Sequence, residues 1–179
     1  MTEFFRQIKT EHFHLIIEPL SKYNNGMLSK REIEIFALKS ILNILNPKLK
    51  VEYNLYGAPF LNTNNAISIS HSKKYIAIIF SQKQTSIDIE LISQKALKVS
   101  PKFLNKKELA KVNDKETATL YWSAKECLYK IFQKGKLNFS SDLIVTNVKE
   151  KHLECLMFDK KYILQYEKFD SHYLVYYFD

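Results

Sequence analysis

Glycine and proline are scarce in this chain, with three and four residues respectively among 179. No segment is rich in serine and glycine either, so the sequence offers no candidate for a long flexible linker. If the chain has two parts, a tight joint must connect them. Hydrophobic residues make up 46% of the sequence, enough for the core of one domain or of two small halves.

Long apolar runs are also missing. None approaches the roughly 18 residues that span a bilayer, and the N-terminal segment lacks the unbroken apolar core of a signal peptide. We therefore expect a cytoplasmic protein with no membrane partner. There are only two cysteines, Cys127 and Cys155. They lack CxxC spacing and a secretory context, so free thiols are expected rather than a disulfide or a zinc site.

The chain carries a formal net charge of +8, and this charge is unevenly distributed. Residues 95–136 contain eleven lysines against four acidic residues, a net charge of +7. A basic region of this kind favours an anionic partner, such as nucleic acid, a phosphorylated small molecule or an acidic protein. For any single lysine, a solvated helix face is the simpler explanation.

Helical and extended patterns follow one another in two blocks. The first block has a strand at 12–17, a helix from a capping box at Ser29 to about Asn46, turns at 56–59 and 62–65, and strands near 51–55, 66–70 and 75–80. The second has a strand at 86–90, a helix after Ser100-Pro101, a helix at 114–132, and strands near 143–148, 153–158, 161–167 and 172–178. We predict an α+β fold of two similar halves, 1–84 and 85–179, with helices packed on small antiparallel sheets.

The segment Ser86-Ile-Asp-Ile-Glu90 places two carboxylates on one face of a strand. Its period of two sends Ile87 and Ile89 to the opposite face from Asp88 and Glu90. Adjacent carboxylates repel unless solvent or a cation neutralises them. An exposed sheet edge would suffice, but Mg²⁺ also seeks carboxylate oxygens and keeps coordination positions for water and phosphates.

A second group lies on the predicted helix that ends near Phe132. Trp122, Glu126 and Lys130 are spaced four residues apart and form one stripe. Glu126 and Lys130 could be a surface ion pair worth roughly 0.2–0.5 kcal/mol. Read together with Asp88 and Glu90, they offer a third carboxylate and a cation that could meet a phosphate oxygen.

A third group is Ile67-Ser-Ile-Ser-His71-Ser72. Alternation places Ser68 and Ser70 on the polar face of a strand, with His71 at its end. Hydroxyls and an imidazole can bind an anion, although a histidine that only caps the strand end would give the same pattern.

Four motifs, in this order, resemble those of the Sfp-type 4'-phosphopantetheinyl transferases: Tyr56-Gly-Ala-Pro59, Ser68-Ile-Ser-His71-Ser72, Ile87-Asp-Ile-Glu90 and Trp122-Ser-Ala-Lys-Glu126-x-x-x-Lys130. The sequence departs from the family pattern at three positions, where Ser86 replaces glycine, Ser68 replaces asparagine and Ala58 replaces a common lysine. The resemblance implies a pseudo-twofold relation between the halves, with coenzyme A and Mg²⁺ in the cleft between them.

The resemblance also implies roles for individual residues. The expected Mg²⁺ ligands are Asp88, Glu90 and Glu126. Lys130 is expected to contact the pyrophosphate of coenzyme A. The 3'-phosphate end is expected to meet Arg31, Ser70 and His71, and Lys39, on the same basic helix as Arg31, is expected to be part of the coenzyme A site. The adenine is expected to lie on the turn formed by Tyr56, Gly57, Ala58 and Pro59.

The implied activity is Mg²⁺-dependent transfer of 4'-phosphopantetheine from coenzyme A to a serine of an apo acyl or peptidyl carrier protein, with release of 3',5'-ADP. Glu126 would take the serine proton, and Lys130 would add positive charge. Carrier domains are typically acidic, which gives the basic stretch a partner. A monomer with no nucleic-acid partner is expected.

Two other functions fit parts of the sequence. A metal-dependent nuclease would explain the acidic residues and the basic surface, but its acid and lysine normally lie on neighbouring strands rather than at helical spacing. A basic nucleic-acid-binding module would explain the charge and the 13% aromatic residues. It gives no reason for Asp88, Glu90 and Glu126, which would repel phosphate without a metal.

Overall fold

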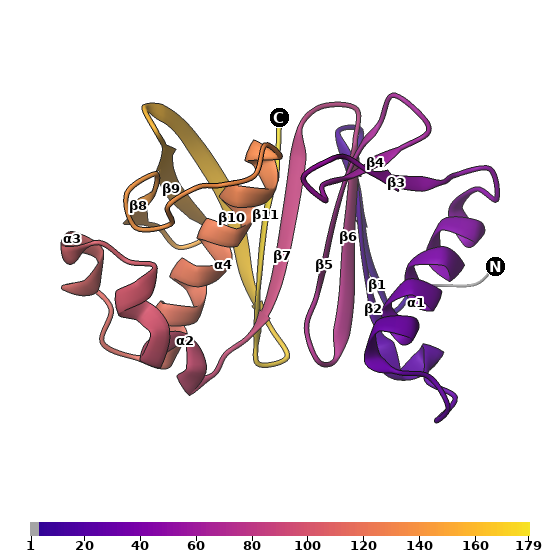
Figure 1. The fold of residues 1–179 in the computed structure, drawn as a ribbon, viewed down its shortest axis with the longest axis horizontal. Coiled ribbons are helices and arrows are strands. Elements are labelled where there is room, and N and C mark those ends of the chain that lie inside the picture. Colours follow the sequence, from indigo (N-terminus) through magenta and orange to yellow (C-terminus); the bar gives the residue numbers. More distant parts are fainter. Residues whose placement is uncertain (1–3) are drawn as a thin grey trace. The chain divides into compact units, whose positions relative to one another are not determined.

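The computed structural model describes residues 4–179 (Figure 1). The contacts divide them into two compact units. One unit runs to Thr85 and also includes Phe178–Asp179, and the other is Ser86–Tyr177. Mixed helices and antiparallel sheets confirm the predicted α+β class. The boundary between residues 84 and 85, and the pseudo-twofold relation between the halves, stay predictions.

The first unit is built on a four-stranded antiparallel sheet in the order β1-β2-β6-β5, with a separate β3-β4 hairpin. Its elements are β1 (Arg6–Lys9), β2 (Phe13–Pro19), the short 3-10 helix η1 (Leu20–Tyr23), α1 (Lys30–Leu45), β3 (Val51–Tyr53), β4 (Pro59–Leu61), β5 (Ala66–His71) and β6 (Tyr75–Ser81). Helix α1 runs along one face of this sheet (Figure 1).

Helix α1 starts at the predicted capping box. The Ser29 Oγ accepts a hydrogen bond from the Glu32 amide, and the Glu32 Oε2 accepts one from the Ser29 amide at 2.8 Å. The helix ends at Leu45, two residues before Pro47, which cannot continue it. Its inner face packs against the apolar residues of β2 and β6, in a core that includes Ile16, Ala37, Ile41, Leu42, Ile76 and Ile78.

The second unit has a five-stranded antiparallel sheet in the order β7-β11-β10-β9-β8. Its elements are β7 (Thr85–Leu91), α2 (Gln94–Val99), the 3-10 turn η2 (Ser100–Lys102), α3 (Lys106–Leu109), α4 (Lys115–Phe132), β8 (Leu143–Val148), β9 (His152–Met157), β10 (Lys160–Phe169) and β11 (His172–Phe178). The buried face of α4 packs against this sheet and against α2, in a core that includes Ala96, Ala124, Leu128, Val145, Leu153 and Leu164.

The prediction of a helix starting after Ser100-Pro101 is wrong. Helix α2 precedes this pair and ends at Val99, and the pair itself begins the 3-10 turn η2. Proline tolerates such a turn because it has no amide hydrogen to leave unbonded. The next helix, α3, starts only after Asn105, whose side chain forms a capping box with Glu108. The sequence prediction also omitted β1 and β4, which are short strands at the margin of the first unit.

Candidate functional site

Strand β7 carries the first part of the candidate site. Ile87 and Ile89 are fully buried, as the alternation predicts, but Asp88 is also buried, with only 3% of its surface exposed. The explanation of a solvated edge is therefore wrong for this carboxylate. Its Oδ2 accepts a hydrogen bond from Ser123 Oγ, and its Oδ1 accepts one from Lys130 Nζ, both at 2.7 Å.

Helix α4 carries the facing part. Asp114 caps its start by accepting a hydrogen bond from the Thr117 amide, which fixes the phase of the predicted stripe. The indole of Trp122 donates to Glu90 Oε1 at 3.3 Å, and the Lys130 ammonium also donates to the Ile87 carbonyl at 2.9 Å. The stripe and the two β7 carboxylates therefore lie together within the second unit.

The Trp122 ring is itself held in place. Its centroid lies 5.0 Å from that of Phe103 and 5.6 Å from that of Phe139. Aromatic contacts at these separations favour one ring orientation. The indole N–H is thereby directed toward Glu90.

Two carboxylates of this group, Glu90 and Glu126, lie in surroundings that disfavour their charged form. Burial, and then the nearby charge of Asp88, raise the pKa of Glu90 to about 7. Burial also raises the pKa of Glu126, against the opposing effect of Lys130. Burial is the largest effect on Lys130 and lowers its pKa, but the charge and hydrogen bond of Asp88 and the charge of Glu126 together outweigh it and raise the pKa. The group therefore combines one cation, Lys130, with three neighbouring carboxylic acids, Asp88, Glu90 and Glu126.

The donor set suits a hard divalent cation, because it consists of carboxylate oxygens and would gain a compensating charge. In the part of the chain that the structure describes, however, no three His, Cys, Asp or Glu side chains are arranged to hold a metal ion. Both Asp88 oxygens already have donors, from Ser123 and Lys130. The carboxylate oxygens therefore suit Mg²⁺ as ligands. In this structure, the positive charge that compensates Asp88 comes from Lys130.

Sequence reasoning missed Ser123, which lies seven residues before Lys130 and therefore on the same side of α4. Counting seven residues back from Lys130 along the predicted helix would have pointed to it. It also missed the contact of Ser86 Oγ with Cys127 Sγ, at 2.7 Å. Burial raises the pKa of Cys127 to about 12, so this residue is a neutral thiol packed beside the site.

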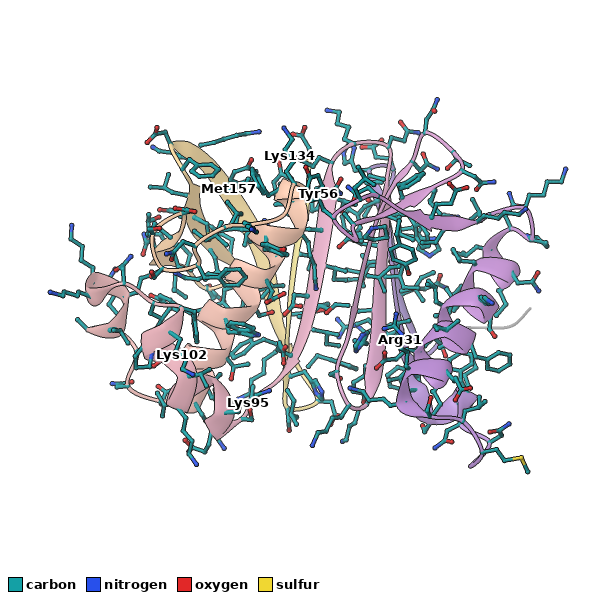
Figure 2. All side chains as sticks on the ribbon, viewed as in Figure 1. Arg31, Tyr56, Lys95, Lys102, Lys134 and Met157 are labelled. Carbon is teal, nitrogen blue, oxygen red and sulfur yellow. The ribbon has the colours of Figure 1, made fainter. Side chains whose placement is uncertain are left out.

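The basic stretch contains fewer exposed charges than its sequence suggests. Lys125 is fully buried, and its Nζ donates to Glu108 Oε2 at 2.7 Å and to three backbone carbonyls, those of Phe103, Phe139 and Leu143. In Figure 2, Lys95 and Lys102 project from one end of the second unit and Lys134 lies at the other end. The remaining positive charge is therefore distributed over the unit rather than gathered in one patch.

In the first unit, the predicted anion-binding group lies at the end of β5. Ser70 is buried, while His71 is exposed and its Nδ1 lies 3.1 Å from Glu34 Oε1 on α1. Arg31 and Lys39 are exposed on the same helix, eight residues apart. The structure therefore brings His71 to α1 through Glu34.

The predicted adenine turn connects β3 and β4. Asn54 Oδ1 accepts hydrogen bonds from the amides of Tyr56 and Ala58, and Gly57 has a φ of +80°, a conformation that favours glycine. Pro59 is the first residue of β4, where its missing amide hydrogen costs little. Tyr56 is 63% exposed, so the tip of this turn presents an aromatic ring to solvent.

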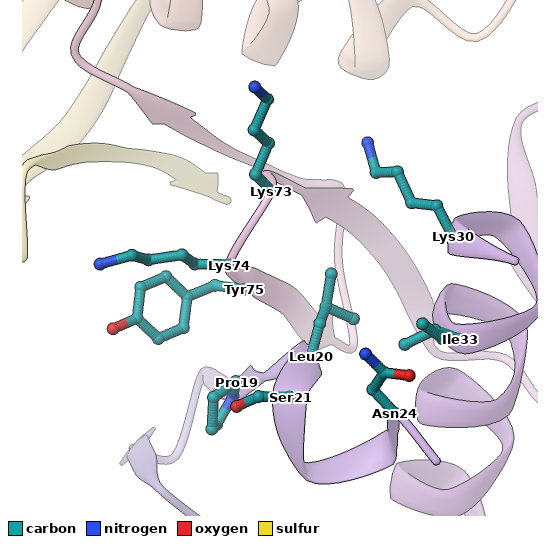
Figure 3. Close-up of a pocket in the computed structure, with 9 residues that line it drawn as sticks. All are labelled: Pro19, Leu20, Ser21, Asn24, Lys30, Ile33, Lys73, Lys74 and Tyr75. Atoms are coloured by element: carbon teal, nitrogen blue, oxygen red, sulfur yellow. The ribbon is translucent and has the colours of Figure 1, made fainter. Parts of the chain in front are cut away.

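A cavity of about 490 Å³ lies in the first unit beside the start of α1 (Figure 3). Its wall includes one lysine from α1, two lysines from the β5–β6 turn, and residues in and around η1. The lining residues are Pro19, Leu20, Ser21, Asn24, Lys30, Ile33, Lys73, Lys74 and Tyr75. The lysines favour an anionic occupant.

A family comparison decides how the second unit is classified. The model of the 4'-phosphopantetheinyl transferase superfamily matches residues 85–176, which is more than half of the chain. The chain belongs to this superfamily. The match contains β7, α4 and therefore every residue of the acidic group and Lys130.

One curated relative extends this classification. The chain is 30% identical over 104 residues to the 4'-phosphopantetheinyl transferase gsp of Aneurinibacillus migulanus. That alignment covers 55% of this chain but only 44% of the relative, so it spans less than half of that superfamily member. Among residues 4–179 there is no helix long and apolar enough to span a bilayer.

Proposed function

We propose that this chain transfers the 4'-phosphopantetheine group of coenzyme A to a serine of an apo carrier protein and releases 3',5'-ADP. One observation carries the proposal. Within the segment that matches the superfamily, Asp88 is held between Ser123 and Lys130, with Glu90 and Glu126 close enough to share its electrostatic field. A nuclease is less well supported, because Glu126 and Lys130 both lie on α4 rather than on neighbouring strands.

The metal ligands in this proposal are Asp88, Glu90 and Glu126. Bound Mg²⁺ would polarise the β-phosphorus of coenzyme A and neutralise charge on the departing 3',5'-ADP. Ser123 keeps Asp88 in place from the opposite oxygen. Lys130 offers its ammonium to a pyrophosphate oxygen as negative charge develops there.

Glu126 is the proposed general base. The serine oxygen of the carrier bonds to the β-phosphorus, and the bond from that phosphorus to the bridging oxygen of 3',5'-ADP breaks. The Glu126 carboxylate takes the serine proton, directly or through water. Burial raises the pKa of Glu126 in the metal-free protein.

The first unit would bind the nucleotide end of coenzyme A. Its proposed contacts to the 3'-phosphate are Arg31, Ser70 and His71. Lys39 on the same helix would also belong to the coenzyme A site, and the turn from Tyr56 to Pro59 would hold the adenine. The exposed lysines of the second unit would attract an acidic acyl or peptidyl carrier protein. We also propose that the protein acts in the cytoplasm as a monomer.

Mass spectrometry of apo carrier proteins tests the proposal. Incubating acyl and peptidyl carriers with the protein, Mg²⁺ and coenzyme A should add the mass of one phosphopantetheinyl group to a serine. Glu126→Gln should reduce the rate by at least about a hundredfold, and Glu150→Gln, an exposed change in the same unit, should not. Full modification by Glu126→Gln would refute the role of this carboxylate, and no modification of any carrier would refute the activity.

Trp122 provides a separate test of metal binding. It is the one tryptophan in the chain and donates to Glu90, so its emission reports on that carboxylate. Adding Mg²⁺ with coenzyme A should change the emission in a saturable way, and EDTA should reverse the change. Asp88→Asn and Glu90→Gln should abolish the response. An unchanged response in both variants would exclude these residues as ligands.

A further inference from the structure

Glu34 is a partly buried acid that has no other role in the proposed reaction. Its side chain is 12% exposed and projects from α1 toward the Lys30 ammonium and the His71 imidazole. Glu34 Oε1 lies 3.1 Å from His71 Nδ1 and 3.5 Å from Lys30 Nζ. Among residues 4–179 this buried oxygen has no hydrogen bond of good geometry. Its charge is therefore compensated by these two ion contacts.

Lys30 and His71 are not equivalent partners of Glu34. The Lys30 side chain is 63% exposed and flexible, and exposed pairs of this type contribute little. The His71 side chain is 43% exposed, and its Nδ1 lies beside the Glu34 carboxylate, so this contact restricts the orientations open to the ring. A protonated imidazole would also balance the buried charge. A phosphate at this end of β5 would then be met by Nε2.

We propose that Glu34 is a positioning residue for the 3'-phosphate of coenzyme A, acting by restraining the imidazole of His71 in an orientation that faces that phosphate. This inference rests on the proposed function, which brings coenzyme A to the first unit. Elsewhere in proteins, a carboxylate behind an imidazole orients the ring nitrogen that meets a ligand, and the Glu34–His71 contact places a carboxylate in that position. Glu34 therefore contributes to recognition without touching the substrate.

A purely structural role makes a different prediction. If Glu34 only ties α1 to β5, its loss would affect all ligands alike. The cavity in Figure 3 offers a further contrast, because Lys30 lines it together with Lys73 and Lys74. A 3'-phosphate in that cavity would depend on these lysines rather than on His71.

The test compares ligands that differ only in the 3'-phosphate. Transfer rates are measured with coenzyme A and with dephospho-coenzyme A, and equilibrium binding is measured with 3',5'-ADP and with AMP. Glu34→Gln should reduce the preference for the 3'-phosphorylated ligand about tenfold through KM, the scale of one charge-assisted hydrogen bond. The kcat with dephospho-coenzyme A should stay unchanged. His71→Gln should have a similar effect, and the double variant should lose little more.

Glu11→Gln is the matched control, because Glu11 Oε1 lies 3.2 Å from His12 Nε2 in an exposed pair of the same unit. It should keep the full preference. Equal losses for both ligands in Glu34→Gln would overturn the inference, as would a preference that Lys73→Gln and Lys74→Gln abolish and Glu34→Gln leaves intact.

Failure of the proposed function is distinguishable from failure of this inference. A protein that transfers nothing but binds 3',5'-ADP more tightly than AMP in a Glu34-dependent way refutes the activity and supports the role of Glu34. A protein that transfers phosphopantetheine with no preference for the 3'-phosphate refutes the role of Glu34 alone.

Discussion

Asp88 is a carboxylate with a different donor on each oxygen, and each donor comes from α4. Ser123 lies at one oxygen and Lys130 at the other, so the acid is held in one orientation by residues two helical turns apart. The helix therefore sets the direction in which the proposed metal ligand points.

Ser123→Ala should destabilise the fold by about 1–3 kcal/mol, because it leaves a buried carboxylate oxygen without its hydrogen-bond donor. Urea unfolding followed by circular dichroism measures this change. Ser141→Ala is the matched control, since the Ser141 hydroxyl donates to Asp142 at 2.7 Å on the exposed surface. Equal losses of unfolding free energy in the two variants would contradict the explanation that burial makes the Ser123 hydrogen bond costly to remove.

Lys125→Met should destabilise the fold by about 3–5 kcal/mol, because it leaves Glu108 as an unpaired charge in the core. Glu108 also accepts hydrogen bonds from the amides of Val145 and Asn105, so this carboxylate is fixed in place and cannot turn toward solvent. Thermal and urea unfolding measure the loss.

The control for Lys125 is Lys168→Met, which removes an exposed ion pair with Glu116 at 2.9 Å. Its expected cost is below about 1 kcal/mol. If Lys168→Met costs as much stability as Lys125→Met, burial in the core is not the reason why losing the lysine is costly.

At the scale of elements, α4 is the helix on which the proposed site depends. It carries the acidic stripe on one side and buries residues such as Ala118, Ala124 and Leu128 on another. Its first turn is fixed by Asp114, and its last residue is followed by Gln133 in a left-handed conformation. Both ends are therefore defined by the local sequence.

Asp114→Ala should destabilise the fold by about 1 kcal/mol at pH 7, as expected for loss of a helix cap. The hydrogen bond from the Thr117 amide lowers the pKa of Asp114. The stabilisation by the ionised cap is therefore complete above about pH 3.9, the pKa of aspartate in unfolded chains. It is lost as the pH falls through the lower pKa that Asp114 has in the folded protein. The difference between wild type and Asp114→Ala should shrink over that range.

Asp114→Asn is the control for this pH effect. Asparagine keeps the hydrogen-bond acceptor but does not titrate, so its stability relative to Asp114→Ala should not vary with pH. Urea unfolding from pH 7 to pH 2.5 measures both differences. A wild-type advantage that stays constant to the lowest pH would contradict the assignment of ionised Asp114 as the cap.

At the scale of the whole molecule, the net charge of +8 acts at a distance. The Lys125–Glu108 and Lys130–Asp88 pairs are internal, so steering depends on the exposed lysines that remain. Lys95, Lys98 and Lys102 are exposed on α2 and η2. Replacing all three lysines with glutamine should lower kcat/KM for an acidic carrier about fivefold at low salt, with little effect at high salt.

The control replaces Lys149, Lys151 and Lys161, which are exposed near the β8–β9 and β9–β10 turns. It removes the same charge from another part of the same unit. Transfer kinetics over a series of NaCl concentrations compare the two triple variants. Equal effects would indicate that only net charge matters, and no effect in either would exclude electrostatic steering.

Much of the fold could be predicted because the signals are local. The capping box at Ser29, the cap at Asp114 and the alternation in β5 and β7 each depend on residues within a few positions. Helix α2 and strand β1 were missed because short elements depend on tertiary packing, as Ala96 of α2 packs in the core of the second unit.

The sequence by itself determined the order of the motifs, the faces of β7 and α4, and the types of residue that can form an acidic site. Only the tertiary structure decided which partners they have. Asp88 proved buried rather than solvated, Lys125 proved a core residue rather than a surface charge, and Ser123 and Glu34 acquired partners on other elements. Periodicity depends on local backbone geometry, whereas burial and pairing depend on segments that are distant in the chain and meet only when it folds.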